Sequence, residues 1–109
     1  MIITDDSPGD DVEKLAGSYS NKFPLCYFKN EKPLGTPENW NEAIRHAKGE
    51  WIKLMHDDDW FSIPDTLEIF ADAVKKNPGK NFFYSAYNNV YENGNREPVF
   101  ISDFRRKRL

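Results

Sequence analysis

The sequence of 109 residues has little cysteine, no long apolar run and no excess of basic charge. Its one cysteine, Cys26, excludes an internal disulfide, and the apolar residues around it predict a buried, unreactive thiol. No apolar run approaches the roughly 20 residues that span a bilayer. The formal net charge of -3 gives no general attraction to nucleic acid. The length suits one small domain. The absences predict a reducing compartment, which we expect to be the cytoplasm, and no nucleic-acid partner.

The basic residues that do cluster lie at the carboxyl terminus, as the run Arg-Arg-Lys-Arg over residues 105–108. A solvated terminus is the favoured interpretation of this run. The alternative is a patch attracted to anionic lipid headgroups, which would place the protein peripherally at the inner face of a membrane. We therefore divide the chain into a domain over residues 1–101 and a basic tail over residues 102–109.

Strand-like and helix-like segments alternate along the chain. Short apolar runs rich in β-branched or aromatic residues predict strands over residues 1–4, 23–28, 51–55, 81–91 and 98–101. Apolar residues at helical spacing predict helices over residues 10–18, 37–47 and 62–77, the first capped by Asp10 or Asp11. Asn93 and Gly94 predict a hairpin turn before the last strand. This alternation implies an α/β fold with a mostly parallel sheet flanked by helices.

Two acidic clusters follow directly on predicted strands: Asp5-Asp6 and Asp57-Asp58-Asp59. Ligands of open α/β sheets bind beyond the carboxyl ends of the strands, so both clusters are predicted to lie on the same rim. Three consecutive carboxylates repel one another unless a positive charge offsets them. Mg²⁺ and Mn²⁺ prefer such oxygen ligands, and Mg²⁺ often binds one or two carboxylates together with phosphates. The functional interpretation is therefore a divalent ion beside a diphosphate.

Each cluster also has a structural interpretation, to which the local sequence gives equal weight. The second cluster can cap the helix that follows it and face water, and the first can form a turn and an N-cap. His56 adjoins the second cluster, but no second histidine or cysteine stands at ligand spacing. A packing or hydrogen-bonding role is therefore favoured for His56. Trp40 is expected in the core or in a pocket wall.

The order of these segments resembles that of the family 2 glycosyltransferases, which have the GT-A fold. Residues 2–10 resemble the family's second strand and its Asp-Asp-Gly-Ser-type loop, and residues 30–35 resemble its Asn-x-x-x-x-Gly loop. Residues 38–44 resemble the next helix, residues 47–53 the Ala-x-Gly-Glu-aromatic-Ile segment, and residues 54–60 the Asp-x-Asp region. The resemblance extends to about residue 101 and implies a partial GT-A (Rossmann-like) sheet.

The resemblance implies a nucleotide-sugar site with named residues. Asp5 and Asp6 match the acidic pair near the base of the donor, and which of the two makes the contact is left open. Asn41 matches a recurrent asparagine of the helix. Asp57 is expected to contact the ribose.

The metal residues follow from the Asp-x-Asp region. Its third position, the usual metal ligand, falls on Asp58, and its first position falls on His56, which departs from the common pattern and weakens the match. An alternative register pairs Asp57 with Asp59, so Asp58 and Asp59 are both predicted metal ligands for Mg²⁺ or Mn²⁺.

The resemblance further implies an inverting, metal-assisted glycosyltransferase. It would move a sugar from a nucleotide-diphospho-sugar, with a UDP-sugar favoured, to a carbohydrate or lipid-linked acceptor. In that mechanism an acidic base deprotonates the acceptor hydroxyl. No residue here matches that base, so no catalytic residue is assigned. The rival interpretation is a non-catalytic α/β module that binds a metal or a nucleotide.

The family's first strand also has no counterpart in this sequence. We therefore expect the N-terminal donor-binding portion of such an enzyme, truncated at both ends and inactive alone. The strand edges that flank the missing strand would be exposed and would favour self-association.

Overall fold

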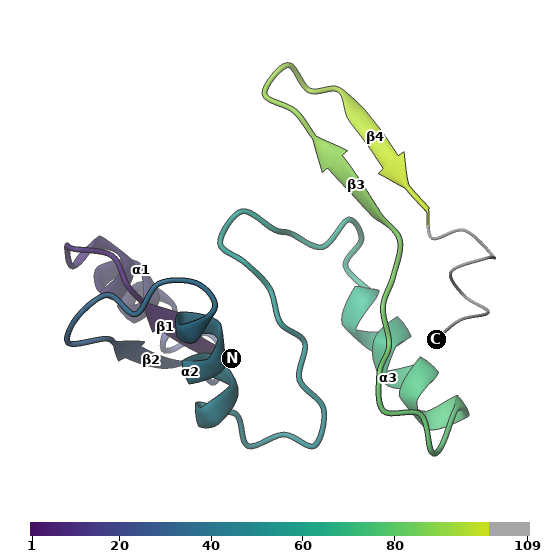
Figure 1. The fold of residues 1–109 in the computed structure, drawn as a ribbon, viewed down its shortest axis with the longest axis horizontal. Coiled ribbons are helices and arrows are strands. Elements are labelled where there is room, and N and C mark those ends of the chain that lie inside the picture. Colours follow the sequence, from purple (N-terminus) through teal and green to yellow (C-terminus); the bar gives the residue numbers. More distant parts are fainter. Residues whose placement is uncertain (101–109) are drawn as a thin grey trace. The chain divides into compact units, whose positions relative to one another are not determined.

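A computed structural model of the chain describes residues 1–100, which form two compact units. The first unit comprises residues 1–59 and the second begins at residue 60. The basic tail predicted over residues 102–109 lies outside the described residues, so the boundary at residue 101 stays a prediction. Figure 1 labels the helices and strands of both units.

The first unit is a β-α-β motif followed by a second helix (Figure 1). Strand β1 (Ile2–Asp5) pairs in parallel with strand β2 (Cys26–Lys29), and helix α1 (Asp11–Tyr19) connects them. A parallel pair needs such a crossover, because a tight turn cannot bring the second strand back in the same direction. Helix α2 (Glu38–His46) follows β2. These elements confirm the predicted α/β class.

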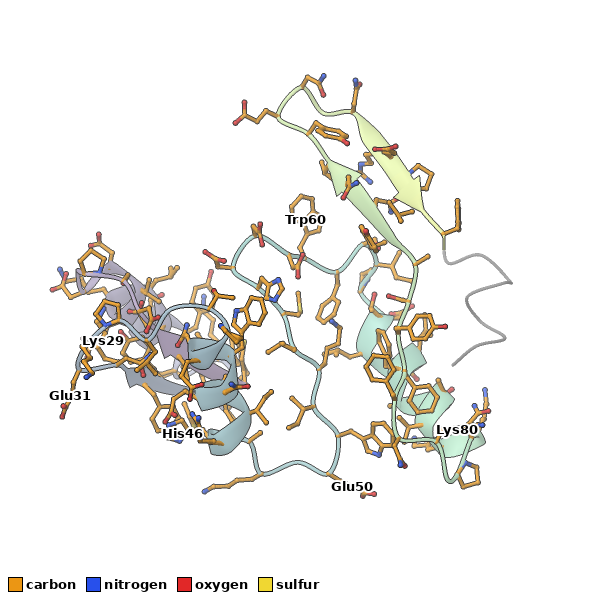
Figure 2. The ribbon with its side chains drawn as sticks, in the orientation of Figure 1. Lys29, Glu31, His46, Glu50, Trp60 and Lys80 are labelled. Atoms are coloured by element: carbon orange, nitrogen blue, oxygen red, sulfur yellow. The ribbon has the colours of Figure 1, made fainter. Side chains whose placement is uncertain are left out.

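Helix α2 and the apolar groove under α1 lie on opposite faces of this sheet. Thr4 and Phe28 are register partners, and both contact α2. The Thr4 hydroxyl donates to a backbone carbonyl of α2 at 3.0 Å, and Phe28 stacks on His46, with ring centroids 3.6 Å apart. His46 is labelled on α2 in Figure 2. Because side chains alternate along a strand, Ile3 faces the other way. There it lines an apolar groove of about 250 Å³ together with Ala16 of α1.

The core of the first unit is small. Among the residues that the structure describes, Ala16 is the one buried apolar residue and Asp5 the one buried charged residue. Leu15 of α1 also lines the apolar groove and is 61% exposed. Cys26 is also exposed, so the prediction of a buried thiol is wrong. Helix α2 ends over Phe28 and leaves Cys26, the first residue of β2, uncovered.

Residues 51–55, which were predicted to be a strand, are neither strand nor helix in the structure. Their apolar side chains are only partly covered, with Trp51 41% and Ile52 48% exposed. Such a run becomes a strand only when its backbone finds ladder partners, and the β1–β2 sheet does not extend to it. Within residues 1–100 the predicted parallel sheet is therefore a single parallel pair.

The second unit contains helix α3 (Thr66–Lys76) and an antiparallel hairpin of β3 (Tyr87–Val90) and β4 (Arg96–Val99). Gly94, at φ +80°, lies in the hairpin turn, and its N–H donates to the Tyr91 carbonyl at 2.8 Å. The helix and the turn confirm the sequence prediction. The strand predicted over residues 81–91 is shorter, because β4 offers partners only to residues 87–90. No helix among the described residues is long and apolar enough to cross a membrane.

Candidate functional site

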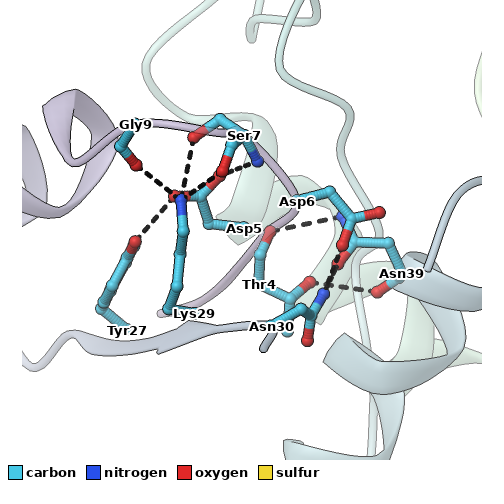
Figure 3. Close-up of polar contacts among 9 residues, drawn as sticks. All are labelled: Thr4, Asp5, Asp6, Ser7, Gly9, Tyr27, Lys29, Asn30 and Asn39. Atoms are coloured by element: carbon cyan, nitrogen blue, oxygen red, sulfur yellow. Dashed lines mark hydrogen bonds and ion pairs between the residues drawn. The ribbon is translucent and has the colours of Figure 1, made fainter. Parts of the chain in front are cut away.

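The buried carboxylate of Asp5 joins the two strands of the first unit (Figure 3). Asp5 is 5% exposed and begins the acidic loop, which we define as residues 5–10. Its Oδ1 accepts a hydrogen bond from the Ser7 backbone N–H at 2.7 Å. Its Oδ2 accepts from the Tyr27 hydroxyl at 2.6 Å and from Lys29 Nζ at 2.9 Å. Since Asp5 and Lys29 are register partners, this ion pair ties the carboxyl ends of β1 and β2 together.

Lys29 also holds the rest of the acidic loop. Its ammonium group donates to the backbone carbonyls of Ser7 and Gly9, the latter at 2.6 Å, and to the Ser7 hydroxyl at 3.2 Å. One cation therefore offsets the charge of the buried carboxylate and satisfies carbonyl groups of the turn (Figure 3). The acidic loop is consequently folded back over the end of β2.

The contacts of Asp5 set its protonation state. Burial by itself raises the pKa of the Asp5 carboxyl group, because the charged form loses water. The hydrogen bonds from Tyr27, Ser7 and Lys29 outweigh burial and hold that pKa well below its usual range. Burial and the same hydrogen bond raise the pKa of Tyr27 to about 12. At neutral pH the carboxylate is therefore ionised and the phenol keeps the proton that it donates.

Asp6 is half-buried and turns to the loop that follows β2. Its Oδ1 accepts from Asn30 Nδ2 at 2.6 Å, and its Oδ2 accepts from the backbone N–H groups of Leu34 and Gly35 at 3.0 and 2.8 Å. The hydrogen bond from Asn30 is the main cause that lowers the pKa of Asp6. Asn30 and Gly35 are the two fixed positions of the Asn-x-x-x-x-Gly pattern, and both contact this carboxylate. The pattern therefore describes a loop that closes on Asp6.

Helix α2 joins this network through Asn39. Its Oδ1 accepts from Asn30 Nδ2 at 2.9 Å, and its backbone carbonyl accepts from the Thr4 hydroxyl at 3.0 Å. Asn41, the predicted nucleotide-sugar residue of this helix, is exposed and donates to Glu38 Oε2 at 3.1 Å instead. Two residues apart on a helix, side chains point to different sides. The structure thus connects Asn39 to the acidic loop through Asn30, and the role predicted for Asn41 stays a prediction.

A second group of ligating atoms lies after the irregular segment. One ligand atom each of His56, Asp58 and Asp59 lies within 4.8 Å of the others, and all three residues are exposed. We call these three residues the His56 cluster. Asp59 Oδ2 accepts from the His56 backbone N–H at 3.3 Å and lies 3.7 Å from His56 Nδ1. One imidazole and two carboxylates are a donor set that fits a divalent ion such as Mn²⁺. Asp57 is exposed and is not part of this group.

Neither acidic cluster caps a helix. The N-cap residue of α3 is Asp65, well beyond the His56 cluster. The N-cap residue of α1 is Asp10, whose side chain makes no capping hydrogen bond and pairs with Lys14 at 2.8 Å. The predicted N-cap position of Asp10 is therefore confirmed, although its side chain makes no capping hydrogen bond, and the capping role predicted for both acidic clusters is wrong. The turn interpretation of Asp5 is confirmed by its hydrogen bond from the backbone of Ser7.

The first turn of α2 contacts one residue next to each acidic cluster. Asn39 bonds to Asn30, which in turn bonds to Asp6. The next residue, Trp40, stacks on the imidazole of His56, with ring centroids 4.4 Å apart and an interplanar angle of 20°. All of these residues belong to the first unit. The acidic loop and the His56 cluster therefore have a common support in one helical turn.

The sequence prediction missed four residues of this network: Thr4, Tyr27, Lys29 and Asn39. Their types are ordinary for strands and helices, and they meet the acidic residues because of the β1–β2 register and the packing of α2. One signal was present in the spacing of Tyr27 and Lys29. At two residues apart on a strand they share a face, so both can reach one carboxylate of a neighbouring strand.

Comparisons with known proteins agree on one family. The model of glycosyl transferase family 2 matches residues 1–109. A protein described as an uncharacterized glycosyltransferase from Haemophilus influenzae is 33% identical over 84 residues, which are 77% of this chain and 27% of that protein. A protein of Methanocaldococcus jannaschii with the same description is 27% identical over 96 residues, 87% of this chain and 33% of its own. Chondroitin synthase of Escherichia coli is 27% identical over 95 residues, 87% of this chain and 14% of its own.

The chain spans about a third or less of the length of these three relatives. No solved structure matches it significantly. The family model nevertheless covers every residue, including the acidic loop and the His56 cluster. The resemblance drawn from the sequence is thereby confirmed, and the chain belongs to glycosyl transferase family 2.

Proposed function

We propose that the chain forms the donor-binding side of an inverting glycosyltransferase. The enzyme would transfer a sugar from a nucleotide-diphospho-sugar to a carbohydrate or lipid-linked acceptor, with Mg²⁺ or Mn²⁺ as cofactor. The observation that carries this proposal is the common support of the acidic loop and the His56 cluster by the first turn of α2. A site for the nucleoside and a site for the ion that holds its diphosphate have to be fixed relative to each other. This helical turn provides such a connection.

The residues of the His56 cluster have the chemistry for the diphosphate end of the donor. The carboxylates of Asp58 and Asp59 and the imidazole of His56 would hold the divalent ion. A bound ion supplies stabilisation of the charge that builds up on the departing diphosphate. Asp57 is exposed beside them and is proposed to contact the ribose. The base that activates the acceptor is not assigned to any residue of this chain.

The identity of donor and acceptor is a further part of the proposal. A UDP-sugar is the favoured donor, as the family resemblance implies. A carbohydrate acceptor is supported by the similarity to a protein named for the synthesis of chondroitin, which is a polysaccharide. Self-association is proposed through the outer edges of β1 and β2, which have no strand partner among residues 1–100.

A titration with nucleotide diphosphates tests the metal site. We expect the full chain to bind UDP with an affinity that rises when Mn²⁺ is added. Asp58→Asn should lower the Mn²⁺-dependent UDP affinity by at least about tenfold, because residues that hold or orient a metal typically contribute about 10- to 100-fold. Calorimetry with UDP, GDP and ADP, with and without Mn²⁺, measures this and identifies the base.

The matched control is Asp72→Asn, which removes an exposed carboxylate that pairs with Lys75 and Lys76 on α3. This variant should bind UDP and Mn²⁺ like the unaltered chain. If Asp58→Asn also binds both ligands unchanged, the carboxylates of the His56 cluster do not hold the ion. The proposed metal-assisted mechanism would then be wrong.

We assign the contact with the nucleoside to Asp6 rather than to Asp5. Both carboxylates accept three internal hydrogen bonds, but Asp5 is only 5% exposed, so a ligand does not reach its oxygens. Asp6 is half-buried, and its lowered pKa keeps it ionised at neutral pH. An ionised carboxylate makes stronger hydrogen bonds to an imide N–H or a ribose hydroxyl than a neutral group does.

Asp6→Asn tests this assignment, because it keeps the shape of the side chain and removes its charge. We expect the affinity for UDP without metal to fall by roughly fivefold to tenfold, since charge-assisted hydrogen bonds are about twice as strong as neutral ones. Asp10→Asn, in the same loop but paired with Lys14 on the surface, should change the affinity less than about twofold. Equal affinities of Asp6→Asn and the unaltered chain would refute the assignment.

A further inference from the structure

We infer that Trp40 is a positioning residue that holds the imidazole of His56 in the orientation needed to bind the divalent ion. The inference rests on the proposed function, since it concerns the same metal site. Its basis is the stacked contact between the two rings, with centroids 4.4 Å apart and planes at 20°. Trp40 lies outside the Asp-x-Asp region and is no metal ligand itself. It therefore acts through His56.

His56 needs such a support because of the segment that carries it. Residues 47–59 contain no helix or strand, so the backbone around His56 is not held by a ladder or by helical hydrogen bonds. The imidazole itself is 41% exposed. A flexible ligand has to lose rotational freedom when an ion binds, and this loss lowers the affinity. A ring that is already stacked has lost part of that freedom before binding.

Trp40 in turn is fixed to the sheet. It lies in the first turn of α2, next to Asn39, which bonds to Thr4 and to Asn30. The other end of α2 is held by the stack of His46 on Phe28 of β2. These contacts fix α2, and with it the half-buried Trp40, relative to β1 and β2. The imidazole of His56 is thus held in place relative to the sheet by its contact with α2.

The orientation of the stacked imidazole fits ion binding. Its Nδ1 lies 3.7 Å from Asp59 Oδ2, and a ligating atom of the ring lies within 4.8 Å of both carboxylates of the cluster. An aromatic face against the ring leaves the ring nitrogens, which lie in its plane, directed away from Trp40. The stack therefore restrains the ring without occupying its ligating atoms.

Three variants of the full chain test the inference. We expect Trp40→Ala to weaken Mn²⁺ binding by roughly fivefold to tenfold, near the lower end of the effects seen when residues that orient metal ligands are removed. Trp40→Phe keeps an aromatic face and should restore the affinity to within about twofold of the unaltered chain. Ile44→Ala is the matched control, because it truncates an exposed apolar residue of the same helix. It should leave Mn²⁺ binding unchanged.

Two readouts separate positioning from a general loss of structure. Electron paramagnetic resonance measures free Mn²⁺ directly, and UDP affinity without metal reports on the acidic loop, which should stay within about twofold in all variants. With the rings stacked, the NMR signals of the His56 ring should carry a ring-current shift from Trp40. That shift should disappear in Trp40→Ala and persist in Ile44→Ala.

Unchanged Mn²⁺ affinity in Trp40→Ala would overturn the inference while the proposed function stands. An equal loss in Ile44→Ala, or no recovery in Trp40→Phe, would also overturn it, because the effect would then not depend on the stacked ring. Failure of the unaltered chain to bind UDP or Mn²⁺ would instead contradict the proposed function itself. The two failures are therefore distinguishable.

Discussion

Lys29→Met is expected to lower the free energy of unfolding of the first unit by roughly 2–4 kcal/mol. The substitution keeps the apolar stem and removes the ammonium group that pairs with the buried Asp5 carboxylate. Removal of one partner of a fully buried pair costs about 3–5 kcal/mol, because an uncompensated charge is left inside. The expected loss is smaller here because 34% of the Lys29 side chain is exposed. The carbonyls of Ser7 and Gly9 lose their donor at the same time.

The matched control for this prediction is Lys14→Met. Lys14 pairs with Asp10 at 2.8 Å, but both side chains are more than half exposed, so the expected loss is under about 1 kcal/mol. Denaturant-dependent hydrogen exchange at the amides of β1 and β2 measures the stability of the first unit separately from the second. Similar losses in the two variants would show that the buried ion pair does not stabilise the unit.

The elements of this chain that could be predicted from sequence are those set by local signals. The helical spacing of apolar residues gave α1, α2 and α3, and Asn93-Gly94 gave the hairpin turn. Residues 51–55 and 81–86 have the composition of strands and yet are not strands in the structure. Strand formation depends on a partner elsewhere in the chain, and composition carries no information on whether that partner is present.

The same distinction between local and distant signals applies to the site. The position of Asp5 and Asp6 at the end of a strand followed from a general rule of α/β sheets. Their separate roles did not, because they depend on which side chains the register places opposite them. Asp5 is paired with Lys29 by the β1–β2 register, whereas Asp6 contacts the loop over residues 30–35. The residues next to the aspartates in the sequence give no indication of either contact.

Trp40 and Asn39 extend this argument to the link between the two acidic clusters. The sequence predicted a helix there and placed Trp40 in the core or a pocket wall. It contained no indication that Asn39 contacts the Asn30 that binds Asp6 while the next residue stacks on His56, because this depends on how α2 packs on the sheet. The support of the site is therefore a tertiary property, while the ligating residues themselves are visible as sequence motifs.

Acidification is expected to unfold the first unit through Asp5 and Asp6. Both carboxyl groups have pKa values below those of the unfolded chain, where aspartate titrates near about 3.9. In the acid range the unfolded state therefore binds more protons, and stability falls as the pH drops below about 5. Protonation removes this stabilisation, because the neutral carboxyl groups accept weaker hydrogen bonds from Tyr27, Lys29 and Asn30 than the carboxylates do. Hydrogen exchange of the β1 and β2 amides between neutral pH and about pH 3 measures this loss.

Tyr27→Phe tests whether Asp5 causes the loss of stability in acid. The variant removes the hydroxyl that donates to Asp5 Oδ2 at 2.6 Å and leaves the ion pair of Asp5 with Lys29 in place. Without this hydrogen bond the native pKa of Asp5 rises toward its unfolded value, so protonation of the native state begins at higher pH. The variant should therefore be less stable at neutral pH and should lose less stability on acidification than the unaltered chain. Tyr19→Phe is the control, because it alters a tyrosine of α1 that does not contact Asp5. Identical pH dependence of Tyr27→Phe and the unaltered chain would mean that Asp5 does not control the acid stability of this unit.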